Sequence, residues 1–334
     1  MTLVELMIAM AIGLMLMAGI TTLIVQQSAT RTELENSSRQ IENGRYAAQV
    51  LRDDIQLAGY YGEFYQLSTV PAALPDPCNL DHAALETLLT LHVQGYDAPA
   101  SVPEPLSECL PSENHIPGTD ILVVRRADTT TVPVASAAAN PNQVYLQTGI
   151  DPVTGELEYK LNIGSNASQF NLQNLDKSTA ALRKFLVHIY FLSPCNTMAD
   201  ATCADTDDGG NPIPTLKRLE SGVVSGAAGF TLVPLVEGIE NMQLDYGLDD
   251  DAASRDGAPD SYVTDPTSPD GWSNAMVIRI NLLARNNVPS PTHKDTKTYN
   301  LGLADDIPAA NDNYKRHVFS QVVRMTNPSG RRDK

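Results

Sequence analysis

The chain begins with a long hydrophobic segment. Residues 6–25 read LMIAMAIGLMLMAGITTLIV and carry no charge. A helix of this length rises about 30 Å, which matches the hydrocarbon core of a bilayer. A signal peptide would begin with basic residues, and none precedes this segment. The pattern therefore predicts a membrane-spanning helical half over residues 1–28.

The next segment keeps a helical pattern but becomes amphipathic. No proline interrupts residues 26–58. Apolar and small residues share one face at seven-residue spacing: Leu34, Ile41, Ala48 and Ile55, with Ser37, Gly44, Leu51 and Ala58. Half of this stripe is small, so a sheet could approach closely. We expect residues 29–58 to continue the first helix and to stop at Gly59.

The remaining chain alternates between loops and strand patterns. Residues 59–120 are rich in proline and predict a loop-rich αβ region, with a short helix over 82–92 capped by Asp81. From residue 121 to 334 the pattern predicts a β-sheet head. Its expected strands are 121–125, 143–147, 185–192, 239–246, 275–283 and 317–325. Helices do not alternate with these strands, so we predict an α+β fold in which a long N-terminal helix packs on an antiparallel sheet with extended loops.

Charge and motifs narrow the function. The net charge of −17 opposes the binding of phosphate backbones, so we expect no direct nucleic-acid partner. The motifs GxSxG, HExxH and GxxxxGK[ST] are absent, so we expect no enzymatic activity. An acidic loop over 247–271 is a candidate Ca²⁺ site, although its register is not that of an EF-hand; the alternative is a solvated turn. The candidate ligands are Asp249, Asp251, Asp256 and Asp260.

The chain has four cysteines, an even number behind a membrane segment. That arrangement favours two disulfides in an oxidising compartment. Of the three possible pairings we favour Cys78–Cys109 and Cys195–Cys203; buried free thiols are the alternative. Glu5 stands out at the edge of the apolar helix, because a carboxylate in such a place needs a partner.

The N-terminal residues MTLVELMIAMAIGL resemble the mature N-terminus of type IV pilins, FTLVELMIAxAI. The resemblance implies that a prepilin peptidase cuts before position 1, that this residue is methylated, and that Glu5 pairs with the terminal amine of a neighbouring subunit. Met1 stands where the family has Phe, and the basic leader is missing. We interpret the sequence as a mature form begun with an artificial methionine; a wrongly set gene start is the alternative.

Four further segments are similar to minor pilins of the PilW type: RYAAQVLRDDIQLAGYYG, GIENMQLDYG, MVIRINLLARN and HVFSQVVRMTN. The resemblance implies the pilin fold and a role in starting type IV pilus assembly. Its expected partners are other minor pilins, the major pilin, a tip adhesin and the inner-membrane assembly platform. The expected location is the inner membrane, with one pass and the head outside the cytoplasm, and then the extracellular pilus, with links to twitching motility and cell adhesion.

Two alternatives remain open from the sequence. One is a pseudopilin of a type II secretion system, which would share the N-terminal motif. The other is a membrane-tethered adhesin or ligand-binding head on a pilin-like anchor, whose loops at 60–118 and 247–271 would carry the ligand.

Overall fold

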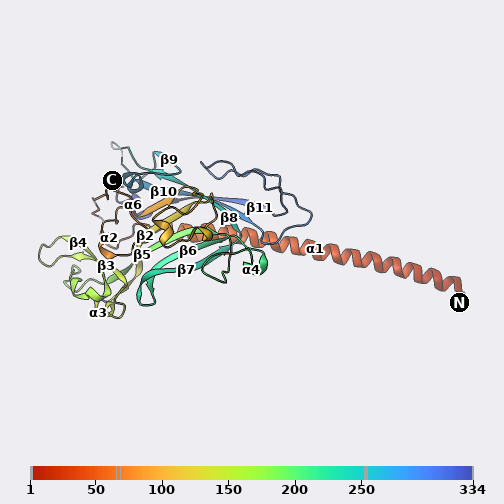
Figure 1. The fold of residues 1–334 in the computed structure, drawn as a ribbon, viewed down its shortest axis with the longest axis horizontal. Helices are drawn as coiled ribbons and strands as arrows, with labels where there is room; N and C mark the ends of the chain where they lie inside the picture. Colours follow the sequence, from red (N-terminus) through yellow and green to blue (C-terminus); the bar gives the residue numbers. More distant parts are fainter. Residues whose placement is uncertain (1–2, 65, 68, 252–254, 333–334) are drawn as a thin grey trace.

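A computed structural model gives the fold and describes residues 3–64, 66–67, 69–251 and 255–332. Helix α1 (Leu3–Gln56) is one unbroken helix of 54 residues. Its first half projects from the head as a free rod, and its second half runs into the head (Figure 1). After two further turn residues the chain leaves the helix direction at Gly59, whose φ of 67° is a left-handed conformation that favours glycine. The predicted long helix and its stop are confirmed.

The head contains two antiparallel sheets. The larger has seven strands in the order β1-β2-β5-β3-β4, and β6 and β7 extend it from β5. Its strands are β1 (Val93–Tyr96), β2 (Ile121–Val132), β3 (Val144–Ile150), β4 (Leu157–Ile163), β5 (Leu182–Ser193), β6 (Thr215–Val224) and β7 (Ala227–Glu237). The smaller sheet has the order β11-β10-β8-β9. Its strands are β8 (Ile239–Leu248), β9 (Ser261–Val263), β10 (Ala275–Arg285) and β11 (Arg316–Arg324).

The six strand patterns read from the sequence are all strands in the structure, and the α+β class is confirmed. Strand β5 is longer than its apolar run, because its start pairs with β3 and its end pairs with β6. Five strands were missed: β1, β4, β6, β7 and β9. The β6–β7 hairpin contains internal glycines and Pro234, which read as turn signals when taken alone.

Short helices fill the connections. Helix α2 (His82–Glu86) is capped by the Asp81 side chain, which accepts a hydrogen bond from the Ala84 N–H. Helix α2 ends before the predicted residue 92, and the residues that follow it form turns. The others are α3 (Val134–Ala137), α4 (Asp207–Gly210), α5 (Pro269–Ser273), α6 (Thr326–Gly330) and the 3-10 turns Leu106–Glu108, Ser112–Asn114 and Gly164–Gln169.

The larger sheet is covered on both faces. Alternate residues of β2 separate the two cores: Leu122 and Val124 face the smaller sheet and the buried half of α1, whereas Ile121 and Val123 face the loop-rich region of residues 59–120. The seven-stranded sheet is therefore the middle layer of the head, and α1 shares the first core with both sheets.

The helix face that packs on the head differs from the predicted stripe. Ala48, Leu51 and Ile55 are buried as expected, but Leu34 and Ile41 are 67% and 40% exposed. An ideal helix drifts by about 20° per seven residues, so a strict seven-residue repeat rotates away from a straight contact line. In place of the two apolar residues, the buried face carries Asn36 and Gln40.

Candidate assembly site

The projecting half of α1 is an uncovered apolar surface. Residues 3–32 are all exposed, and the helix is long and apolar enough to cross a membrane. A contiguous apolar surface of this size calls for a partner, because each Å² left in water costs roughly 25 cal/mol. The hydroxyls of Thr21 and Thr22 donate to the Ala18 carbonyl, both at 2.9 Å, so these polar groups are satisfied within the helix.

Glu5 lies in the first turn of α1, at the far end of the projecting half. Negative charge is favourable at this end of a helix, but that effect does not remove the cost of placing a carboxylate among apolar partners. Pairing with the terminal amine of a neighbour involves a second chain, so this pairing stays a prediction. Met1, the expected processed position, lies outside the described residues.

The other end of α1 is fixed to the head through a buried carboxylate. The Asp54 side chain is only 4% exposed. Its Oδ1 accepts from Arg126 Nε at 2.6 Å, and its Oδ2 accepts from His188 Nδ1 and from the Tyr190 hydroxyl, each at 2.7 Å. Burial alone would raise the pKa of Asp54, but the hydrogen bond and charge of His188, with the charge of Arg126, hold this pKa well below its usual range.

These contacts join α1 directly to two neighbouring strands of the larger sheet and, through Tyr190, to a third. Arg126 belongs to β2, and His188 and Tyr190 belong to β5. Arg218 on β6 donates from Nη1 to the Tyr190 hydroxyl at 3.0 Å. The helix register on the sheet is thus set by directional polar contacts as well as by apolar packing.

Further contacts hold α1 along the smaller sheet. Gln40 Nε2 donates to the Ala284 and Lys315 carbonyls, each at 2.8 Å. Glu33 Oε2 accepts from Lys315 Nζ at 2.5 Å, close to where the helix leaves the head. Gly44 lies against the Phe319 ring, which a side chain at that position would overlap. The expected close approach of a sheet to the small residues is therefore present.

The sequence reading did not single out this junction. Neither Asp54 nor His188 belongs to a motif or pattern that predicted a site from the sequence. One signal was available, because Asp54 lies three residues after Leu51 and four before Ala58, and both of these are buried. A charged residue at buried spacing indicates a partner in the head.

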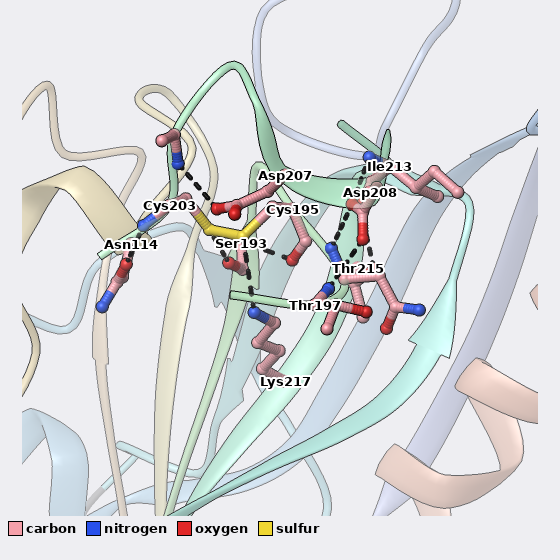
Figure 2. The surroundings of a disulfide bond; sticks show 12 residues. Asn114, Ser193, Cys195, Thr197, Cys203, Asp207, Asp208, Ile213, Thr215 and Lys217 are labelled. Carbon is pink, nitrogen blue, oxygen red and sulfur yellow. Dashed lines mark hydrogen bonds between the residues drawn. A yellow bond between two sulfur atoms is a disulfide. The ribbon is translucent and has the colours of Figure 1, made fainter. Parts of the chain in front are cut away.

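Both disulfides that the sequence favoured are present. The Cα atoms of Cys78 and Cys109 are 5.6 Å apart, and this disulfide cross-links the loop-rich region. Cys195 and Cys203, at 5.7 Å, close a short loop after β5 (Figure 2).

The candidate calcium carboxylates cap backbone groups instead of converging. Asp249 is buried; its Oδ2 accepts from Gly257 N at 2.9 Å and from Arg332 Nη1 at 3.1 Å. Asp260 Oδ2 accepts from the Asp250 and Asp251 amides, at 3.1 and 3.0 Å.

Asp256 caps its own turn through Ala258 N at 2.9 Å. Outside residues 252–254, which the structure does not describe, no three of the four predicted ligands gather within 4.8 Å. Asp249 Oδ1 is buried and has no hydrogen-bond partner among the described residues. Calcium binding stays a prediction.

Comparison with known proteins agrees with this architecture. A family model described as Type IV Pilus-assembly protein W matches residues 203–327, which span β6 to β11 and thus the whole smaller sheet. Comparison with curated proteins and with solved structures gave no match. The matched segment includes the smaller sheet, on which α1 packs, but not β2 and β5, which hold Asp54. The match supports a type IV pilus-related family and a role in pilus assembly.

Proposed function

We propose that this chain is a minor pilin that helps to initiate assembly of a type IV pilus. One observation carries the proposal: a single unbroken helix joins an uncovered apolar half to a half that is fixed in the head. Such a helix can reside in a membrane and then move, with its head attached, into a filament of similar helices. The family match over residues 203–327 supports the pilus as the setting.

Specific contacts, and not the hydrophobic effect, must drive the move of the helix from the membrane into the filament. Lipid is already apolar, so moving the helix from lipid into a filament core releases little hydrophobic free energy. Close packing and the pairing of Glu5 with a neighbouring terminal amine must then determine docking and register. The Asp54 network transmits the position of the helix to the head.

In this proposal the head lies outside the cytoplasm, where two disulfides are stable. The subunit joins other minor pilins in a tip complex that carries an adhesin, with the major pilin below. The acidic surface keeps the head soluble there. Single-pass residence in the inner membrane precedes incorporation.

The test is Glu5→Ala in a tagged full-length subunit. We expect the variant to keep the melting temperature of the wild-type head in detergent, because Glu5 is in the first turn of α1 and the first half of this helix projects from the head (Figure 1). We expect far fewer tagged subunits in sheared pili. Glu35→Ala is the matched control, since Glu35 is an exposed carboxylate on the same helix, paired with Arg31 in solvent. Normal incorporation of the Glu5 variant would contradict the proposed assembly role.

The tip complex is tested separately. The full chain in detergent is used to capture candidate minor pilins and the major pilin from purified preparations. Capture of at least one minor pilin supports the complex. Capture of none, together with normal membrane insertion, would favour a membrane-tethered binding head over a pilus subunit.

A further inference from the structure

The two sulfurs of the Cys195–Cys203 disulfide have different surroundings (Figure 2). Cys195, at the end of β5, is 0% exposed, whereas Cys203 lies on the loop and is partly exposed. Thiol–disulfide exchange requires a thiolate to attack one sulfur directly, so access decides which sulfur is attacked. By exposure, Cys203 is the more accessible of the two cysteines to an external thiol.

A buried ammonium lies beside the inaccessible sulfur. Lys217 on β6 is 1% exposed, and its Nζ is 3.9 Å from Cys195 Sγ. Burial lowers the pKa of Lys217, and the charges of Asp208 and Asp207 oppose that shift. A thiolate on Cys195 would provide this ammonium with an adjacent counter-charge.

The other charged groups near the disulfide do not favour Cys203. The Asp207 carboxylate lies within 4.8 Å of both sulfurs, so its charge opposes a thiolate on either one. Its two oxygens accept from the Ala199 and Ala204 amides, at 3.1 and 2.8 Å, which moderates that effect. Asp208 caps the Asn196, Thr197 and Ile213 amides.

The hydroxyl of Ser193 is the polar group beside Cys203, and its Oγ is 3.1 Å from Cys203 Sγ. A hydrogen bond to a charged donor is roughly twice as strong as one to a neutral donor. The ammonium beside Cys195 therefore stabilises a thiolate more than the hydroxyl beside Cys203. The environment makes Cys195 the better leaving group and Cys203 the accessible electrophile.

We propose that Cys195–Cys203 is a thiol–disulfide exchange site for an external dithiol oxidoreductase. The oxidoreductase thiolate attacks Cys203 Sγ and forms a mixed disulfide there. The bond between the two cysteine sulfurs breaks, and its electron pair stays on Cys195 as a thiolate paired with the Lys217 ammonium. In the oxidising direction, the Cys195 thiolate attacks Cys203 Sγ of the mixed disulfide and releases the oxidoreductase thiolate.

The loop is built to keep the two cysteines together when the bond is open. Asn114 Oδ1 accepts from Cys203 N at 2.8 Å, and Asn114 Nδ2 donates to the Ala201 carbonyl at 3.0 Å. These contacts do not depend on the disulfide. Cys203 therefore stays near Cys195, and the bond can reform.

The site of attack is tested on the wild-type chain in detergent. The protein is treated briefly with an excess of a small aromatic thiol at neutral pH, quenched with acid, and mapped by mass spectrometry. We expect the mixed disulfide on Cys203. Trapping mainly on Cys195 would overturn the proposal. This test does not depend on the folding of any variant.

The role of Lys217 is tested by the rate of reduction with dithiothreitol, followed by differential alkylation. We expect Lys217→Met to slow reduction of Cys195–Cys203 about three- to tenfold, because a less stabilised thiolate leaves more slowly. Lys217→Arg keeps the charge and should restore most of the rate. Lys184→Met, at an exposed lysine on β5, is the matched control. The Cys78–Cys109 bond is the control within the same molecule, and its rate should not change.

An unchanged Cys195–Cys203 rate in Lys217→Met would overturn the role of Lys217, as would an equal change at both disulfides. A pH profile separates an electrostatic role from a packing role. In Cys203→Ser, NMR of Cys195 labelled with ¹³C at Cβ, followed against pH, should show a lower apparent pKa for the thiol than in the Cys203→Ser, Lys217→Met double variant. Equal values in the two variants would also overturn it.

Discussion

Asp54 Oδ2 and His188 Nδ1 lie 2.7 Å apart and join the last turns of α1 to the middle of β5, 134 positions later in the chain. Arg126 and the Tyr190 hydroxyl complete the contacts of the same carboxylate. A buried carboxylate with three donors is stable only while all of them stay in place. This one side chain of α1 therefore couples the helix to the larger sheet, in addition to the contacts that Gln40 and Glu33 make beside the smaller sheet.

Asp54→Asn should destabilise the chain strongly. The substitution keeps the shape of the side chain but removes the negative charge, so Arg126 loses its buried ion-pair partner. The new amide NH₂ group also faces side chains that donate hydrogen bonds to the carboxylate in the wild type. Breaking a buried ion pair in this way costs about 3–5 kcal/mol. The measurement is the free energy of unfolding of the full chain in detergent, from denaturant titration.

The neighbouring position provides the control for this substitution. Asp53 is more than half exposed and pairs with Arg52 in solvent, at 3.1 Å. Exposed pairs contribute at most about 1 kcal/mol, so Asp53→Asn should remain close to wild type. Equal losses in the two variants would show that charge on this part of the helix matters and that the buried network does not.

Because of the same carboxylate, we expect the free energy of unfolding to fall at acidic pH. The pKa of Asp54 is held well below the usual 3.8 in the folded state. As pH falls, the unfolded chain takes up this proton first, so the stabilisation is complete above about pH 5 and is lost as pH falls through 3.8 towards the folded pKa. The difference in unfolding free energy between wild type and Asp54→Asn should shrink as pH falls from 5 to below 4. A difference that grows on acidification would contradict this assignment.

The sequence predicted the elements of this fold better than their contacts. Helix α1 and six strands have strong periodic patterns, which indicate the local backbone conformation and which face of the element is buried. Leu34 and Ile41 fit the periodic pattern but are exposed, because the pattern does not say where the head begins to cover the helix. The strands β6 and β7 were missed for a related reason: their pairing with each other and with β5 stabilises residues whose own preferences are weak.

The candidate sites show the same division. The number of cysteines favoured two disulfides, but four cysteines allow three pairings, and the structure contains the one that we favoured. The acidic loop was harder to interpret, because a carboxylate that caps a backbone amide and one that binds a cation look alike in sequence. Asp249 pairs with Arg332, which lies 83 positions later in the chain, a contact that no local pattern could indicate.

Gly44 predicts a steric limit at the helix–sheet contact. A Cβ at this position would overlap the Phe319 ring. Overpacking costs about 1–3 kcal/mol and the gain in helix propensity returns about 1 kcal/mol, so Gly44→Ala should lower the free energy of unfolding by up to about 2 kcal/mol. Adding Phe319→Leu should recover much of this loss. Gly13→Ala is the control, because nothing lies within 4 Å of that position, and it should leave the stability of the head unchanged. Failure of the double variant to recover would place the strain elsewhere.

The two disulfides should differ in what their removal costs. A cross-link stabilises mainly by restricting the unfolded chain, and the effect grows with the length of the loop it closes. Cys78 and Cys109 are 31 positions apart, whereas Cys195 and Cys203 are 8 apart. Replacing both cysteines of a pair by alanine should therefore cost about 4 kcal/mol for the longer loop and about 2.5 kcal/mol for the shorter one. Denaturant unfolding of the full chain under non-reducing conditions measures both. A larger loss for the short loop would show that the buried surroundings of Cys195 and Lys217, and not loop closure, dominate the contribution of that bond.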